Sequence, residues 1–184
     1  MVPVSPRKNL AVADLMVRIV TLGCAGSGKT TLARQLGGRT GARVICLDDM
    51  WQSHGEEKNV PAFRSLIIKA HAGDQWIRDG SFALATFDIR LTRATLVIWL
   101  ESSKRSCAWR AITRVFKRGR AHRIGKLPEV RAFLWKFDRV HRPRIEAVRA
   151  SHGPEVPVLT LTGSPDIANF LPSYGAGAHD PIQD

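Results

Sequence analysis

The stretch that decides the fold is G-C-A-G-S-G-K-T at residues 23–30. Before it, R-I-V-T-L at 18–22 is a short apolar run rich in β-branched residues, and after it Leu32 and Leu36 are spaced as on one face of a helix. A pair of glycines at 37–38 then ends the helical pattern. Together these signals predict a strand, a glycine-rich turn and a helix, in that order.

The turn has the spacing G-x-x-x-x-G-K-[ST], which is specific for a phosphate-binding loop when a strand precedes it and a helix follows. Its glycines let backbone N–H groups point inward as an anion nest, and the helix N-terminus adds the positive end of its dipole. We expect Lys29 to bridge the β- and γ-phosphates of ATP and the Thr30 hydroxyl to bind Mg²⁺. The residues of the loop expected to bind the nucleotide are Gly23, Ala25, Gly26, Ser27, Gly28, Lys29, Thr30 and Thr31.

The rest of the chain repeats the alternation of strand and helix. Segments of helical length separate four more short apolar runs, at 42–47, 76–78, 94–100 and 156–161. Strands that alternate with helices predict an α/β fold with a parallel sheet covered by helices on both faces. We therefore expect three layers, α/β/α.

Length and composition limit the class of protein. The 184 residues, of which 44% are apolar, suffice for one domain, which we expect at 16–172 between flexible tails at 1–15 and 173–184. No apolar run reaches the roughly 18 uncharged residues of a membrane-spanning helix. The three cysteines lack C-x-x-C spacing and cannot all pair, so we expect reduced thiols and a cytoplasmic protein of unspecified oligomeric state.

Positive charge is concentrated in one part of the chain. The formal net charge is +12, and residues 102–150 alone hold 15 Lys and Arg against three acids, which is also a net of +12. Such a block predicts a surface that binds polyanions, either nucleotide phosphates or nucleic acid; a solvated basic helix surface is the alternative. Within it, K-R-G-R-A-H-R-I-G-K at 117–126 is interrupted by glycines, which is typical of a loop or flap.

Two carboxylates follow the second predicted strand, in L-D-D-M-W at 47–51. They are expected at the carboxyl edge of the sheet, where doubly wound folds bind ligands. We expect Asp48 to orient an acceptor hydroxyl and to accept its proton, because it directly follows the buried run. A turn or helix cap formed by Asp48 and Asp49 is the alternative. Trp51 is expected to stack on the acceptor, whereas core or hinge packing is expected for Trp76, Trp99, Trp109 and Trp135.

The third predicted strand ends in W-I-R-D-G at 76–80. Asp79 is expected to hold Mg²⁺, directly or through a water, or to orient the substrate. Gly80 is expected to let the substrate approach the backbone closely. A structural Asp in the turn from strand to helix is the alternative.

Five of these segments resemble a known group of proteins. They are G-C-A-G-S-G-K-T-T-L-A-R-Q-L, L-D-D-M-W, W-I-R-D-G-S-F, L-V-I-W-L and W-K-F-D-R-V-H-R-P-R-I, and they are similar to segments of the adenylate-kinase-like P-loop proteins called DNA topology modulation proteins. The resemblance covers about residues 17–171. It implies a P-loop NTPase fold like that of nucleoside monophosphate and shikimate kinases, with a five-stranded parallel sheet in the order 2-3-1-4-5. It also implies a mobile, Arg-rich helical lid at about 117–127.

The resemblance also bears on single residues. D-D-M-W is similar to the Asp-Asp-Phe-Tyr turn of uridine-kinase-like enzymes, in which the first Asp serves as the base, and this implies the same role for Asp48. The chain departs from the group at Ser81 and Phe82, where Asn and Tyr are common, and at Phe63, where Trp is frequent. An amide and a phenol that could touch substrate are thus replaced, and the identity of the acceptor is left open.

Arginines of the basic block are implied by the resemblance to reach the phosphates when the lid closes. Arg114 would approach the nucleotide from the helix after strand four, and Arg142 would approach the substrate from the later helix. Arg118 and Arg120 are expected to be catalytic, because a flap flanked by glycines can close and exclude water, and an arginine finger contributes about 10³–10⁵ in rate. For each of them, a solvated surface charge is the alternative.

The leading hypothesis is a kinase that uses ATP and Mg²⁺ to phosphorylate a nucleotide, nucleoside or other small molecule. The second is a nucleotide-gated nucleic-acid-binding protein, suggested by the basic block and the name of the group. Because the sequence has no recognition-helix signature and no evident aromatic stacking platform, we expect only weak, non-specific affinity for nucleic acid. The third is an ATPase switch without an acceptor, which has no need of Asp48. The nucleotide base is expected near the turn at 162–165, and the sequence predicts no preference for ATP or GTP.

Overall fold

The computed structural model describes residues 17–53, 59–80, 86–117, 132 and 134–173. Its centre is a five-stranded sheet in the order β2-β3-β1-β4-β5, in which every pair of neighbouring strands is parallel. The strands are β1 (Arg18–Gly23), β2 (Arg43–Cys46), β3 (Trp76–Asp79), β4 (Leu96–Glu101) and β5 (Val158–Thr162). The α/β class, the parallel sheet and the strand order implied by the resemblance are thereby confirmed.

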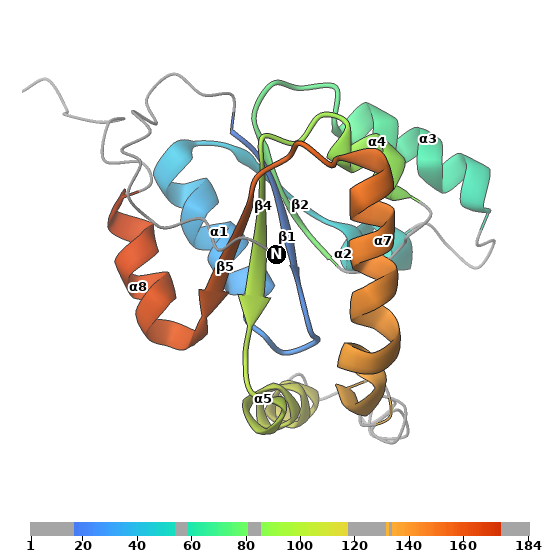
Figure 1. Ribbon diagram of the computed structural model, residues 1–184. Coiled ribbons are helices and arrows are strands. Elements are labelled where there is room, and N and C mark those ends of the chain that lie inside the picture. The colour runs from blue at the N-terminus through green and yellow to red at the C-terminus, as the bar shows by residue number, and fades with distance from the viewer. Residues whose placement is uncertain (1–16, 54–58, 81–85, 118–131, 133, 174–184) are drawn as a thin grey trace, which may run out of the picture.

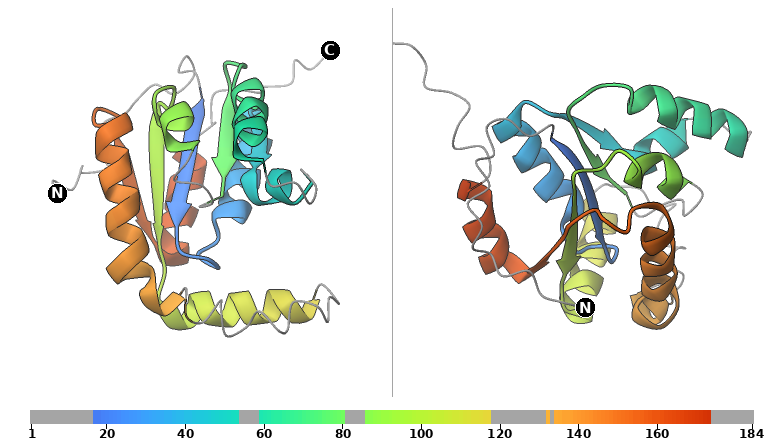
Figure 2. Two further views of the ribbon diagram at one scale, coloured as in Figure 1. Left: turned by 90° about the vertical axis from the view of Figure 1, so that its right-hand side faces the viewer. Right: turned by 45° about the horizontal axis from the view of Figure 1, so that its top comes forward.

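Helices cover both faces of this sheet and complete three layers. Helices α1 and α8 lie against one face, and α2, α3, α4 and α7 lie on the other, while α5 crosses the carboxyl end of the strands (Figure 1; Figure 2). Their bounds are α1 (Lys29–Thr40), α2 (Leu47–Ser53), α3 (Val60–Ala70), α4 (Phe87–Leu91), α5 (Lys104–Lys117), the π-helical turn η4 (Phe137–His141), α7 (Arg142–His152) and α8 (Gly163–Ser173).

The face under α1 and α8 is an aliphatic core. Ile19, Ile77 and Ile98 from three adjacent strands are completely buried there. They pack against Leu32 and Leu36, the two leucines whose spacing predicted α1. Alternate residues of a strand point to opposite faces of the sheet. The residues on either side of each isoleucine in its own strand therefore face the other layer of helices.

The opposite face is built from larger and more varied side chains. Its strands contribute Val20, Ile45 and the ring of Trp76, and its helices contribute Phe87 and Phe137. Arg78 is paired in register with Val20 and Ile45, so its side chain projects into this same layer. Arg78 is completely buried, and so is Arg90 of α4. This face therefore encloses two arginines.

Two predictions about tryptophans are wrong. Trp76 and Trp99 are 1% and 5% exposed and belong to the core as expected, but Trp109 of α5 and Trp135 are 69% and 73% exposed. Helix α5 contacts the phosphate loop at Cys107. Trp109 lies on another side of the same helix, which is exposed.

Several predicted features lie outside the described residues. These are the tail at 1–15, the tail predicted at 173–184 except Ser173, which is the last residue of α8, and the lid beyond Lys117. Over the part of the chain that the structure describes, none of the helices is both long and apolar enough to span a membrane.

Candidate phosphate-binding and acceptor site

The glycine-rich loop is fitted between two other elements. Gly26 has a positive φ of 81°, and a Cβ there would lie 2.4 Å from the carbonyl oxygen of Cys107 in α5. Gly23 has a φ of 139°, and a Cβ there would lie 2.5 Å from the carbonyl oxygen of Leu100 at the end of β4. Both positions therefore require glycine for backbone conformation and for space.

Lys29, the first residue of α1, is placed by this loop. It is 8% exposed, and its Nζ donates to the carbonyl oxygens of Gly23 at 3.0 Å and Cys24 at 2.7 Å. The ammonium group is thus held over the start of the loop before any nucleotide binds. The N-terminus of α1 begins at Gly28, which has no side chain to cap it. Such an N-terminus favours an anion.

Thr30 and Asp79 come together at the carboxyl end of β1 and β3. The Thr30 hydroxyl donates to Oδ2 of Asp79, whose side chain is buried. A hydroxyl and a carboxylate are oxygen ligands of the kind that Mg²⁺ prefers. Among the described residues, no cluster of three or more His, Cys, Asp or Glu could hold a metal. Mg²⁺ on a phosphate substrate needs only one or two protein ligands, so this pair fits the ion.

The residues after β2 are described only in part. Asp48 belongs to the first turn of α2, directly after β2 as expected, but its side chain lies outside the description. Asp49 is exposed. Trp51 is half-buried and packs edge-on against Phe63 of α3, with ring centroids 4.8 Å apart. Its expected stacking on an acceptor stays a prediction.

Gly80 continues β3 with a φ of 126°, and its carbonyl oxygen accepts a hydrogen bond from Nη1 of Arg90 at 3.3 Å. The Nε of Arg90 donates to the carbonyl oxygen of Thr86, and its guanidinium lies 4.1 Å from the centroid of the Phe87 ring. Arg90 therefore fixes the backbone just after Asp79. The sequence analysis did not identify it, because an arginine in a short helix has no distinctive pattern.

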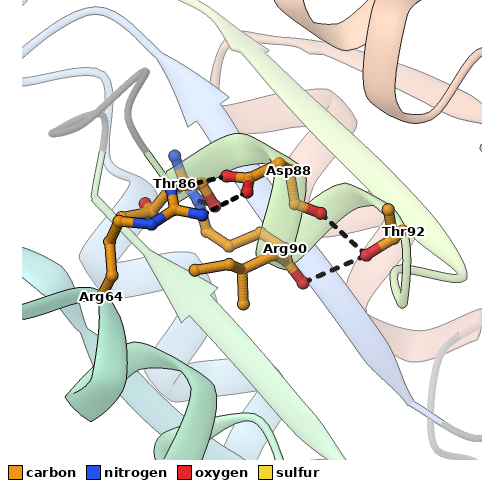
Figure 3. Close-up of polar contacts among 6 residues, drawn as sticks. Arg64, Thr86, Asp88, Arg90 and Thr92 are labelled. Atoms are coloured by element: carbon orange, nitrogen blue, oxygen red, sulfur yellow. Dashed lines mark hydrogen bonds and ion pairs between the residues drawn. The ribbon is translucent and has the colours of Figure 1, made fainter. Parts of the chain in front are cut away.

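An ion pair between an arginine and an aspartate links α3 to α4 beside this site. Arg64 binds both carboxylate oxygens of Asp88, with 3.0 Å between Nη1 and Oδ1 (Figure 3). The hydrogen bonds from Arg64 lower the pKa of Asp88. Asp88 is thus the partner of a half-exposed arginine of α3.

Arg78 differs from every other arginine described. It is 0% exposed, and none of its Nε, Nη1 and Nη2 atoms has a hydrogen-bond partner in the structure. Burial, followed by the charge of Arg90, lowers the pKa of Arg78. No pattern in the sequence singled it out, although an arginine within the short strand predicted at 76–78 is the signal that could have identified it.

The arginines of the basic block are found in different surroundings. Nη1 of Arg110 lies 3.5 Å from the carbonyl oxygens of Gly26 and Ser27, so α5 brings a cation to the loop. Arg142 is paired with Glu101 at 2.8 Å and Glu146 at 3.0 Å. The side chain of Arg114 and the whole of Arg118 and Arg120 lie outside the described residues.

A pocket of about 580 Å³ adjoins the phosphate loop. It lies between the end of β4, α5, η4 and the turn from β5 to α8. Trp99 and Phe137 supply apolar walls, and Arg110 and Arg142 supply positive charge. The remaining wall is the turn at 162–164, where the sequence analysis expects the nucleotide base.

No protein-family model matches the chain, and no curated protein matches it. Its fold is similar to that of solved structures with low sequence identity. A shikimate kinase from Acinetobacter baumannii in complex with shikimate has a TM-score of 0.57 and 15% identity, covering 90% of this chain and 96% of that one. A gluconokinase from Sinorhizobium meliloti 1021 has a TM-score of 0.53 and 15% identity, covering 89% of this chain and 91% of that one. A shikimate kinase from Bacteroides thetaiotaomicron has a TM-score of 0.53 and 18% identity, covering 84% of this chain and 94% of that one.

The fold is that of P-loop kinases. At 14–18% identity these likenesses show the fold alone. The narrower resemblance to the DNA topology modulation proteins stays a prediction.

Proposed function

We propose that the protein is an ATP-dependent phosphotransferase that moves the γ-phosphoryl group to a small acceptor such as a nucleotide or a nucleoside. The observation that carries the proposal is the geometry of Lys29, Thr30 and Asp79. One side chain offers an ammonium group over the loop, and the other two offer paired oxygens at the adjoining strand end. These are the three groups that a P-loop kinase needs around a metal-bound triphosphate.

Each residue has a separate role in this proposal. Backbone N–H groups of the loop and Lys29 hold the phosphates, and Thr30 and Asp79 hold the ion. Mg²⁺, when bound, neutralises charge on the phosphate oxygens. Asp48 accepts the proton of the acceptor hydroxyl. Arg110 is already next to the loop, and Arg114, Arg118 and Arg120 add positive charge as the reaction proceeds.

The pocket of about 580 Å³ is the proposed place for the nucleotide base. It is continuous with the loop through Cys24, and it has the apolar walls that a planar base requires. Arg142 lies in its wall, where its guanidinium is 5.1 Å from the centroid of the Trp99 ring and is paired with Glu101 and Glu146.

Two further features are part of the proposal. We infer membership of the adenylate-kinase-like group called DNA topology modulation proteins, supported by the five segments of residues that resemble it. We also infer a cytoplasmic location, supported by the free thiols of Cys24, Cys46 and Cys107.

Nucleic-acid binding is the second candidate function, and one observation favours it. Trp109 and Trp135 are exposed within the basic block, and the ammonium of Lys104 lies 5.8 Å from the Trp135 ring centroid. Aromatic rings among cations can stack on bases. Tight, ATP-switched DNA binding at physiological salt would favour this function. Weak binding without sequence preference, with a slope of about −0.9 in log affinity against log salt for each phosphate neutralised, would indicate only charge attraction.

The decisive experiment is an ADP-release screen with purified protein, Mg²⁺-ATP and a panel of nucleosides, nucleotides and small metabolites. An acceptor that stimulates turnover supports the kinase. Acceptor-independent turnover would instead support an ATPase switch.

Asp48→Asn then tests the base. A general base acts in the transition state, so this change should lower kcat by about tenfold or more while leaving ATP affinity nearly unchanged. Asp49→Asn is the matched control at the next position. A kcat for Asp48→Asn within about threefold of the parent would move the base to another carboxylate.

A further inference from the structure

A buried charge without a counter-ion is the least satisfied feature of the described residues. Arg78 projects from β3 into the layer between the sheet and α4, beside Val20 and Ile45. Its side chain is 0% exposed, and its three guanidinium nitrogens have no hydrogen-bond partner in the structure. An arginine in this condition has lost its water and gained nothing in return.

The guanidinium group has no way to avoid this cost alone. A buried lysine or carboxyl group can become neutral, but arginine keeps its proton in proteins. Burying an ion without a partner is among the largest penalties that a folded protein can carry. An anion inside the same layer would remove that penalty.

The surroundings of Arg78 increase the need for an anion. Arg90, also 0% exposed, is close enough for its charge to act on Arg78. Arg90 itself donates to the carbonyl oxygens of Thr86 and Gly80, and the negative charge of Asp88 acts on it. The Nε1 of Trp76, two residues before Arg78 on the same face, is a further buried donor without an acceptor.

Among the described residues, two carboxylates near Arg78 are engaged elsewhere. Asp88 of α4 forms its ion pair with Arg64. Asp79 follows Arg78 in the strand, so it points to the opposite face, where it accepts from Thr30. In the parts of the chain that the structure describes, no ion pair includes Arg78.

The location joins this charge to the reaction. Arg78 lies one residue before Asp79, and Arg90 binds the carbonyl oxygen of Gly80, one residue after it. The two arginines therefore flank the strand end that carries the proposed Mg²⁺ ligand. They do so on the face of β3 that is turned away from α1.

We propose that Arg78 and Arg90 form a binding site for an oxyanion, a carboxylate or phosphate group, of the phosphoryl acceptor. The assignment rests on the proposed kinase function, and it narrows the acceptor to an anionic molecule. The oxyanion accepts hydrogen bonds from the guanidinium of Arg78 and balances its charge, while the neighbouring charge of Arg90 adds to the attraction. A free phosphate ion has the same chemistry, and the second experiment below separates the two sources.

The first experiment measures binding of inorganic phosphate without any enzyme assay. Thermal unfolding is followed against phosphate concentration at constant ionic strength, in a Lys29→Ala background that weakens phosphate binding at the loop. Phosphate should raise the Tm of this parent. Adding Arg78→Met should remove the rise and should leave the protein at least as stable in phosphate-free buffer, because an apolar side chain replaces an unpaired charge. Adding Arg43→Met, at an exposed position of the adjacent strand β2, should leave the rise intact.

Two results of the phosphate titration would overturn the proposal. One is a Tm of the Lys29→Ala protein that does not depend on phosphate, and this measurement does not require the Arg78 variant to fold. The other is a rise that is equally large with and without Arg78. A strong loss of stability by Arg78→Met in phosphate-free buffer would also count against it, since the guanidinium would then have a partner within the protein.

The second experiment compares matched acceptors, such as a nucleoside with its monophosphate, or a sugar alcohol with its sugar acid. The parent should prefer the anionic member by about tenfold or more in kcat/KM, and Arg78→Met should reduce that preference to less than about threefold. Equal turnover of both members would mean that the site holds a free ion and that the proposal is wrong. If no acceptor stimulates turnover, the proposed function fails, while the phosphate titration still decides whether Arg78 binds an anion.

Discussion

The two faces of the sheet bury different kinds of residue. Under α1 and α8 the strands present isoleucines, and polar groups such as Lys29, Thr30 and Asp79 gather at the carboxyl end. Under α3, α4 and α7, charged and polar side chains lie within the layer itself, at Arg78, Arg90 and His71. The first face is a core with its chemistry at the edge. The second has polar groups inside it, and their burial costs stability.

Lys29→Ala should have the largest effect and would test the edge of the first face. Removing the ammonium group should abolish measurable ATP turnover, a loss of at least about 10²-fold, while circular dichroism stays unchanged. The lysine contacts carbonyl oxygens of the loop and not the aliphatic core, so the fold should not depend on it. Lys69→Ala, on an exposed part of α3, is the control. Retained activity in Lys29→Ala would remove the basis of the phosphate-loop assignment.

Leu36→Ala would test the core of the same face. Leu36 is completely buried in the cluster with Leu32 and Ile19. Its truncation should lower the free energy of unfolding by about 2–5 kcal/mol, measured by urea denaturation. Leu66→Ala, at a 38% exposed position of α3, should cost much less. Similar losses in both variants would show that the face under α1 is not the main aliphatic core.

The sequence predicted the first face better than the second for a physical reason. A phosphate loop needs glycines, a lysine and a hydroxyl at fixed spacing, and an apolar core needs periodic leucines, so both leave local patterns in the chain. Arg78 and Arg90 lie 12 residues apart, and only the folded chain brings the charge of one close enough to act on the other. The pairing of Arg142 with Glu101 and Glu146 was not indicated by the local pattern of charges, and its contact with substrate stays a prediction.

His71 provides an acid-sensitive test of the second face. It is 1% exposed, its Nδ1 is bonded to the Ile67 carbonyl oxygen, and burial together with the charge of Arg78 lowers its pKa to about 4. In the unfolded chain the imidazole is protonated as the pH falls below about 6.5, whereas in the folded chain it stays neutral until about pH 4. The stability that neutral His71 contributes is therefore fully present above pH 6.5 and is lost as the pH falls toward 4. The loss should reach about 3 kcal/mol.

Urea denaturation at pH 7, 5.5 and 4.5 would measure this effect. His71→Asn should flatten the decline relative to the parent, whereas His152→Asn, at an exposed position of α7, should not. An equal decline in the parent and both variants would mean that the pKa of His71 does not differ between the folded and the unfolded chain.

The smallest effect is expected for the ion pair between α3 and α4, and it would sharpen the contrast with Arg78. Arg64 and Asp88 are each more than one third exposed, with side-chain values of 36% and 37%. Solvent screens such a pair, so a double-mutant cycle with Arg64→Met and Asp88→Asn should give a coupling of about 0.2–1 kcal/mol that falls as salt is added. Arg64 has a carboxylate partner and retains access to water, whereas Arg78 has neither. Arg64→Met should therefore leave the effect of phosphate on Tm intact, and a loss of that effect in this variant would move the anion site from Arg78 to the surface between α3 and α4.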